Sequence, residues 1–205
     1  MSGDTAVVKS SDSAYVFTRS GDSWSQQQKL TFEAPEFSSG DVSIDKDTIV
    51  LGNPCDSEYI DSELNYSGSV HVFTRSGTVW NLQRKITVPP YDFYGSNFFG
   101  SSVSLDDDTL VVGAPGDDNT GNSSTGGWSY VFTRSGTIWN LQHELTAFDG
   151  EPFNHFGHSV SISGDTAVIS SKAGAYIYTG SGDQSETTCT ACPAVYFLLL
   201  KRTLP

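Results

Sequence analysis

The sequence predicts an all-β protein made of repeated four-stranded antiparallel units, and three observations support this. The dipeptide Asp-Thr before an apolar run occurs four times, at Asp4, Asp47, Asp108 and Asp165. The string VFTRSG occurs three times, and IYTGSG is a degraded fourth copy. No segment keeps an apolar i, i+3, i+4, i+7 pattern for three turns, so long helices are not expected. A unit of ~40–60 residues with several short strands is typical of β-propeller blades.

The best copy, Phe99–Thr146, predicts four strands, a to d, at about 100–105, 109–114, 128–134 and 138–145. Strand b is apolar on both faces, which is expected for a strand covered by a sheet on each side. Strand c carries aromatic and aliphatic side chains on opposite faces and is expected to be covered twice as well. Strand d alternates, which suits the half-exposed outer edge of a blade. Its inward residues are predicted to be Trp139, Leu141 and Leu145, with Trp24/Leu30 and Trp80/Leu82/Ile86 in the earlier copies.

The repeats predict two complete and two partial blades, at about 1–36, 37–95, 96–150 and 151–182. The first copy lacks most of strand a, and the fourth departs from the repeat before strand d. A tail, 183–205, follows and contains an apolar run at 194–200. This run is either a strand that replaces the missing strand d or part of a loose or swapped terminus.

Charge and hydropathy argue against nucleic acid as a partner and against a membrane span. The net charge of −13 argues against nucleic acid, whose phosphates favour Lys and Arg. The longest apolar run, Ala194–Leu200, is far shorter than the ~20 residues that span a bilayer, so no membrane span is expected. The first residues show no basic or apolar region of a signal peptide.

Two short elements carry a family resemblance. Phe99-Gly100 is followed by Gly113-Ala114-Pro115, Phe156-Gly157 repeats the first element, and Gly52-Asn53-Pro54 nearly matches the second. The unit resembles the FG-GAP-like repeats that form β-propellers similar to the head of integrin α subunits. The resemblance covers roughly residues 1–182 and implies the propeller fold, whereas propellers serve many functions.

One departure from the family concerns calcium. Integrin-type blades often carry a DxDxDG calcium loop between strands a and b. Here that place holds only tight turns, Asp45–Asp47, Asp106–Asp108 and Ser163–Asp165. Ca²⁺ takes six to eight oxygen ligands, which a three-residue turn does not readily supply. No cofactor is therefore assigned, and Ca²⁺ remains a hypothesis for other loops.

The b–c loops are the candidate ligand-binding segments because they are long and acidic. Their polar residues can bind Ca²⁺ or a basic partner, and the metal ligands named are those of the second loop, Pro115–Gly127; the alternative is a solvated, turn-rich loop. The candidates are Asp56, Glu58, Asp61 and Glu63 in the second copy, and Asp117, Asp118 and Asn119 in the third.

Other motifs are weaker. Asn65 and Asn122 are the acceptors of two N-glycosylation sequons at matching positions of those loops. Cys189 and Cys192 form a C-x-x-C that is compatible with a disulfide, a redox pair or half of a zinc site. His155 and His158 form H-x-x-H, which is either a metal pair or polar filler around the FG turn. The Arg of VFTRSG, at Arg19, Arg75 and Arg134, is expected to pair with a local carboxylate or carbonyl.

No catalytic motif is present in the sequence: G-x-S-x-G and the P-loop are absent, and no acid/base pair stands out. The sequence therefore predicts a non-enzymatic extracellular or cell-surface binding and adhesion module that contacts a protein or glycan through its b–c loops. The alternative is a structural subunit that docks on other chains through its open blade faces. A propeller hydrolase or lyase ranks third.

Overall fold

The computed structural model describes residues 1–32, 40–60, 63–65, 67–87, 97–116, 126–151, 153–179 and 190–193. All regular elements in these residues are β-strands, arranged in four small antiparallel sheets and one short hairpin. No helix in this part of the chain has the length and apolar character needed to cross a bilayer. The predicted all-β architecture is confirmed, and the sheets are consistent with the blades of a partial propeller.

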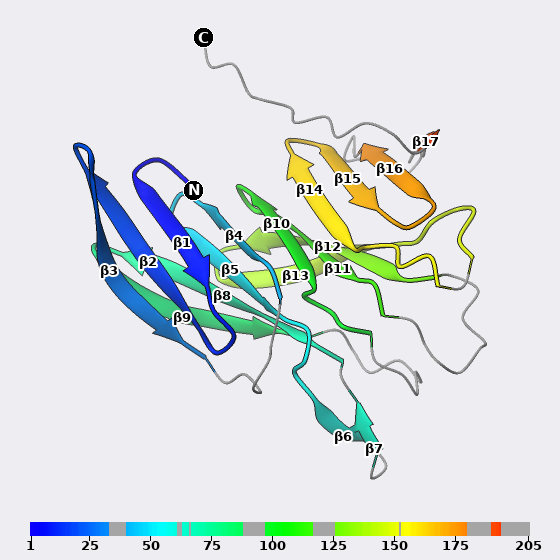
Figure 1. Cartoon of the computed structure of the whole chain (residues 1–205), viewed down its shortest axis with the longest axis horizontal. Helices are drawn as coiled ribbons and strands as arrows, with labels where there is room; N and C mark the ends of the chain where they lie inside the picture. The colour runs from blue at the N-terminus through cyan, green and yellow to red at the C-terminus, as the bar shows by residue number, and fades with distance from the viewer. Residues whose placement is uncertain are drawn as a thin grey trace.

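We number the sheets as blades 1 to 4, and Figure 1 shows them in chain order across the molecule. Blade 1 contains β1 (Thr5–Lys9), β2 (Ser13–Ser20) and β3 (Ser23–Thr31). Blade 2 contains β4 (Val42–Asp45), β5 (Thr48–Asn53), β8 (Ser69–Ser76) and β9 (Val79–Ile86). Blade 3 contains β10 (Ser102–Asp106), β11 (Thr109–Ala114), β12 (Trp128–Ser135) and β13 (Ile138–Leu145). Blade 4 contains β14 (Ser159–Ser163), β15 (Thr166–Ser170), β16 (Gly174–Thr179) and β17 (Thr190–Pro193).

The strands correspond closely to the predicted positions a to d. In blade 3, β11 and β13 have the predicted bounds, and β10 and β12 differ by one or two residues. Blade 1 has strands b, c and d, and in place of strand a the structure shows only a bridge from Ser2 to Thr5. In blade 4 the position beside β16 is held by β17, whereas the apolar segment 194–200 lies outside the described residues.

Three hydrophobic clusters fill the spaces between consecutive blades, and strand b contributes to the clusters on both of its sides. In β5, Ile49 and Leu51 pack toward blade 1, whereas Val50 packs toward blade 3. In β11, Leu110 and Val112 pack toward blade 2, whereas Val111 packs toward blade 4. The expectation that strand b is covered on both faces is therefore correct.

Strand d departs from strict alternation. The pairing of β8 with β9 joins Val72 to Arg84 and Phe73 to Leu82, which leaves Gln83 as the extra residue of a β-bulge. Trp80 and Ile86 are both buried, but Trp80 packs toward blade 1 and Ile86 toward blade 3, so the predicted single inward face of strand d is wrong. Leu82, predicted to point inward as well, is 51% exposed. In the neighbouring strand of blade 1, β3, Gln27 and Gln28 hydrogen-bond Trp80 rather than cover Leu82 with apolar side chains. Its counterpart in blade 3, Leu141, is partly buried against the core.

Replacing Leu51 with Ala should lower the free energy of unfolding by about 2–4 kcal/mol, because the side chain is fully buried between blades 1 and 2. Leu82→Ala is the matched control, and at an exposed position it should change stability by less than about 0.5 kcal/mol. Urea unfolding followed by tryptophan fluorescence measures both. Equal losses in the two variants would contradict the assigned core.

Candidate functional site

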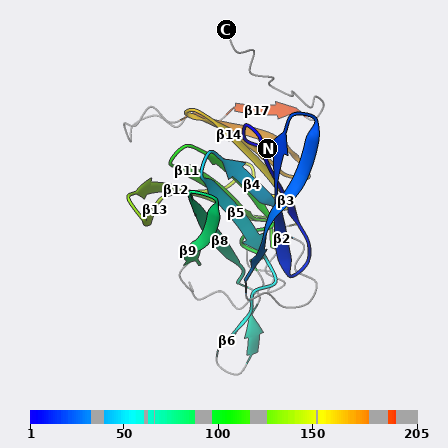
Figure 2. The same ribbon diagram turned by 90° about the vertical axis from the view of Figure 1, so that its left-hand side faces the viewer.

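The two candidate b–c connections leave corresponding ends of strands b and c. In blade 2 the connection runs from β5 to β8 and contains an additional hairpin, β6 (Glu58–Ile60) paired with β7 (Glu63–Asn65). Glu58, Glu63 and Asn65 therefore lie on strands rather than in an irregular loop. Figures 1 and 2 both show this hairpin extending away from the four sheets. In blade 3 the connection runs from β11 to β12, and its central part lies outside the described residues. Among the predicted site residues of these two connections, those not described are Asp61, Asp117, Asp118, Asn119 and Asn122.

Asp56 lies at the base of the hairpin and is engaged within the chain. Its carboxylate pairs with Lys85 of β9 at 2.5 Å, and its side chain is 18% exposed. Its backbone N–H donates to the Asn53 carbonyl at 3.2 Å, and its own carbonyl accepts from the Gly68 N–H at 3.0 Å. These bonds hold together the two ends of the b–c connection. Asp56 therefore anchors the hairpin.

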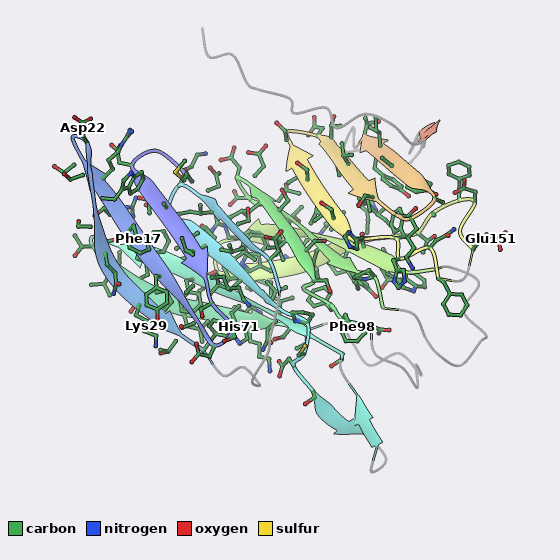
Figure 3. All side chains as sticks on the ribbon, viewed as in Figure 1. Phe17, Asp22, Lys29, His71, Phe98 and Glu151 are labelled. Carbon is green, nitrogen blue, oxygen red and sulfur yellow. The ribbon has the colours of Figure 1, made fainter. Side chains whose placement is uncertain are left out.

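His71 of β8 lies beside this anchor, and the sequence reasoning missed it. Its ring packs on Phe32, with 5.0 Å between ring centroids, and the residue is 3% exposed. The pKa of His71 is lowered to about 4, chiefly by burial and also by the nearby charges of Lys85 and Lys9, with Asp56 acting in the opposite direction. Within the described residues its Nδ1 has no hydrogen-bond partner. Figure 3 places His71 toward the side of the molecule from which β6 and β7 extend.

An alignment of the four copies would have singled out His71. The same position of strand c holds Tyr15, Tyr130 and Tyr176 in the other blades. Tyr130 and Tyr176 each pack edge-on against the Phe of an FG element, at 5.4 Å and 5.2 Å between centroids. Histidine at a position otherwise held by tyrosine is the signal that sequence comparison between repeats provides.

Lys9, at the end of β1, completes the polar neighbourhood between blades 1 and 2. Burial lowers the pKa of Lys9, while Cys55 and Asp41 act in the opposite direction. Its ammonium lies 5.9 Å from the centroid of the Phe32 ring. The b–c side of this blade interface thus gathers two lysines, a histidine and two carboxylates around an aromatic ring.

The a–b turns are joined to those of the neighbouring blades by hydrogen bonds. The first turn residue of each blade accepts a hydrogen bond from the second turn residue of the next: Ser2 from Lys46, Asp45 from Asp107, and Asp106 from Gly164. The second residue has a left-handed φ, of 50° at Lys46 and 52° at Asp107. Lys46 also pairs with Asp107, and this hydrogen bond raises the pKa of the lysine. Asp45 and Asp106 thus join consecutive blades.

The FG and GAP elements form a second set of contacts between consecutive blades, which we call the FG–GAP joint. The Phe99 N–H donates to the Ser67 carbonyl of blade 2 at 3.1 Å, and the Phe156 N–H donates to the Gly126 carbonyl of blade 3 at 2.7 Å. A Cβ on Gly113 would overlap the carbonyl oxygen of Gly157 in the next blade. The buried Ser102 hydroxyl donates to that same oxygen at 2.9 Å. The FG turn therefore lies directly on the GAP strand of the preceding blade, which requires glycine there.

The arginine of VFTRSG forms a third joint. Arg19, Arg75 and Arg134 pair with Asp4, Asp47 and Asp108 of their own blades, as expected from the sequence. Each guanidinium also lies over a tryptophan of strand d, and that of Arg134 is 5.2 Å from the Trp139 ring centroid. Arg134 donates to Thr48 of the preceding blade at 2.8 Å, and Arg75 reaches Thr5 at 3.5 Å.

The bulged glutamines extend this joint. The Trp80 indole N–H donates to Gln27 at 3.2 Å, and the Trp139 indole N–H donates to Gln83 at 3.4 Å. Both glutamines are the extra residues of bulges in the preceding blade. The same set of contacts therefore recurs at successive blade interfaces.

The histidine and cysteine candidates lie near blade 4. One ring nitrogen of His155, Nδ1, lies 2.9 Å from the Pro115 carbonyl of the GAP element, which places this ring at the FG–GAP joint. In the described part of the chain no three His, Cys, Asp or Glu residues are grouped so as to hold a metal ion. Cys192 lies on β17 and Cys189 lies outside the described residues, so their predicted disulfide stays a prediction.

Comparison with known proteins agrees with the fold. The family model described as the FG-GAP repeat matches residues 80–132 and 139–185. These two segments contain the complete FG and GAP elements of blade 3 and the FG element of blade 4. A search of curated proteins finds no match.

The His71→Tyr variant should lose part of the pH dependence of stability. In the wild-type chain, the unfolded state protonates this imidazole near pH 6.5, whereas the folded state protonates it only near pH 4. The contribution of His71 to the free energy of unfolding is therefore fully present above about pH 6.5. It falls as the pH drops to about 4 and stays constant below that pH. The loss is roughly 3 kcal/mol for a shift of this size.

Urea unfolding at a series of pH values measures this effect, and the difference between variant and wild type isolates His71. His143→Tyr, at an exposed position of β13, is the control and should leave the pH profile unchanged. Parallel profiles for wild type and His71→Tyr would contradict the buried neutral histidine.

Proposed function

Because the chain carries FG-GAP repeats over residues 80–185, we propose that it is a non-enzymatic binding module. Its blades form a scaffold, and the b–c connections form the surface that contacts the partner. The observation that carries the proposal is the β6–β7 hairpin, which extends from blade 2 away from the sheets (Figure 2). Binding segments are commonly loops held by a rigid scaffold.

The base of the hairpin supports this role because it is fixed at both ends. The Asp56–Lys85 ion pair and the Gly68–Asp56 hydrogen bond hold the two ends together. Gly68 also bridges Phe99 of the next blade, which ties the connection to the FG–GAP joint. A segment that is held in place before binding loses less conformational entropy when the partner arrives.

The charge of the hairpin favours a basic protein surface as the partner. Glu58 lies on β6 and Glu63 on β7, with Asp61 between the two strands in sequence, and the chain as a whole has a net charge of −13. Opposite charges steer association and improve the match between two surfaces. We place the protein outside the cell or on its surface, because a glycosylation sequon at Asn65 lies on this hairpin.

The binding proposal predicts a salt-sensitive interaction with cationic peptides. The double variant Glu58→Gln/Glu63→Gln should bind an immobilised lysine-rich peptide roughly fivefold more weakly than wild type, at about 0.5 kcal/mol for each charge. The matched control Asp22→Asn/Asp165→Asn removes the same charge from turns at the opposite ends of the strands and should bind like wild type. Biolayer interferometry at low and moderate salt measures both. Equal weakening by the two variants, or binding that is indifferent to salt, would refute the role of the hairpin.

The localisation proposal predicts N-glycosylation at Asn65. When the chain is secreted from eukaryotic cells behind an added signal peptide, an N-glycosidase should increase its electrophoretic mobility. Ser67→Ala destroys the sequon and should remove the part of the mobility shift that Asn65 contributes. Ser123→Ala is the control, because it changes the middle residue of the second sequon and leaves both sequons intact; it should not change the shift. Peptide mass spectrometry identifies the occupied asparagine, and an unmodified Asn65 in the secreted chain would count against the proposal.

A further inference from the structure

One face of blade 1 is open to solvent, whereas the corresponding face of blades 2, 3 and 4 is buried against the blade before it. The register pairs Ala6 with Phe17 and Val8 with Tyr15, which places these four side chains on the side opposite the core shared with blade 2. Val8 is 56% exposed, and Trp24 of β3 is 43% exposed. Their counterparts in blade 2, Leu51 and Trp80, are 0% and 2% exposed. Figure 3 labels Phe17 on this sheet, at the end of the molecule away from blade 4.

Blade 4 presents the complementary face. Val168 pairs with Ile177, on the side opposite the buried Ala167 and Ile169. Around them lie Ser161 and Ser163, both exposed. Ser163 corresponds to Ser2, Asp45 and Asp106, each of which accepts a backbone hydrogen bond from the following blade. Thr166 corresponds to Thr5 and Thr48, which accept from the arginine of the following blade.

We propose that blade 1 of one copy of the chain docks on blade 4 of a second copy, in the arrangement that joins consecutive blades within the chain. At each of the three internal interfaces, a strand b valine of one blade shares a core cluster with a strand b residue of the next blade. The pairs are Val7 and Leu51, Val50 and Val112, and Val111 and Ile169. The fourth member of this series joins Val168 of one copy to Val8 of the other. Arg19 then donates to Thr166, and the Gly3 N–H donates to Ser163.

A second copy is the occupant because the chain itself supplies both halves of the interface. Within one chain the contacts between sheets join consecutive blades, and Figure 1 shows blades 1 and 4 at opposite ends of the row. The side chain of Arg19 is 49% exposed, whereas those of Arg75 and Arg134, which lie within hydrogen-bond distance of Thr5 and Thr48 of the preceding blade, are 28% and 20% exposed. The interface is heterologous, and two copies that close on each other form a ring of eight blades, within the range of known propellers.

Sedimentation velocity of the full chain tests this interface. The wild-type chain should sediment with twice the mass of one chain, and Val8→Glu and Val168→Glu should each reduce the mass to that of one chain. Val79→Glu is the matched control: Val79 is 50% exposed at the start of β9 in blade 2, which is not an end blade, and this variant should sediment like wild type. Circular dichroism confirms that each variant is folded, and Ser161→Glu replaces Val168→Glu if that variant does not fold.

Mixing the two variants gives the decisive result. A head-to-tail interface leaves one intact face on each variant, so an equimolar mixture of Val8→Glu and Val168→Glu should recover twice the mass. A wild-type chain that stays at the mass of one chain would overturn the proposal, as would a Val8→Glu variant that keeps twice the mass. A mixture that remains at the mass of one chain would also overturn it, because that result indicates a symmetric contact.

Discussion

The burial of strand b between two neighbouring sheets is the constraint on which the rest of the structure depends. Val50 and Leu51 are adjacent in sequence and belong to different cores, one on each side of the same strand. A single blade therefore cannot bury its own apolar residues, and stability arises at the interfaces between blades. The glycines of the FG and GAP elements serve this packing, since a Cβ at Gly52 or Gly113 would meet the backbone of the next blade.

The polar part of each repeat is best understood as a set of directional bonds around those apolar interfaces. Burial alone does not determine how two sheets are oriented, whereas hydrogen bonds depend on direction. Asp106 accepts from Gly164, and Arg134 contacts Asp108, Trp139 and Thr48 at once. The aspartates of the a–b turn thus have a structural use in this chain, and their recurrence does not need a calcium ion as its explanation.

Sequence periodicity predicted the features that depend on local pattern. Strands 109–114 and 138–145 lie where their apolar and alternating residues place them, and the VFTRSG arginines pair with nearby carboxylates. Features that depend on the neighbouring blade were missed. The bulge at Gln83 puts Trp80 and Ile86 in different cores and Leu82 is exposed, and the strand beside β16 is β17, which has little of the repeat pattern. The hairpin β6–β7 lies within a segment read as a loop, because each strand has only three residues.

The a–b and c–d turns at one end of the blades tolerate sequence changes less than the b–c connections at the other end. At the a–b and c–d ends, Asp45, Lys46 and Arg75 are each bound to a neighbouring blade, so a substitution there alters the stacking of sheets. At the b–c ends, the bonds of Asp56 and Gly68 close the connection at its base, and the chain beyond that base extends away from the sheets. Length and charge can therefore vary in the b–c connection without disturbing the core. This asymmetry is the physical reason for proposing the b–c end, rather than the a–b and c–d ends, as the partner-binding surface.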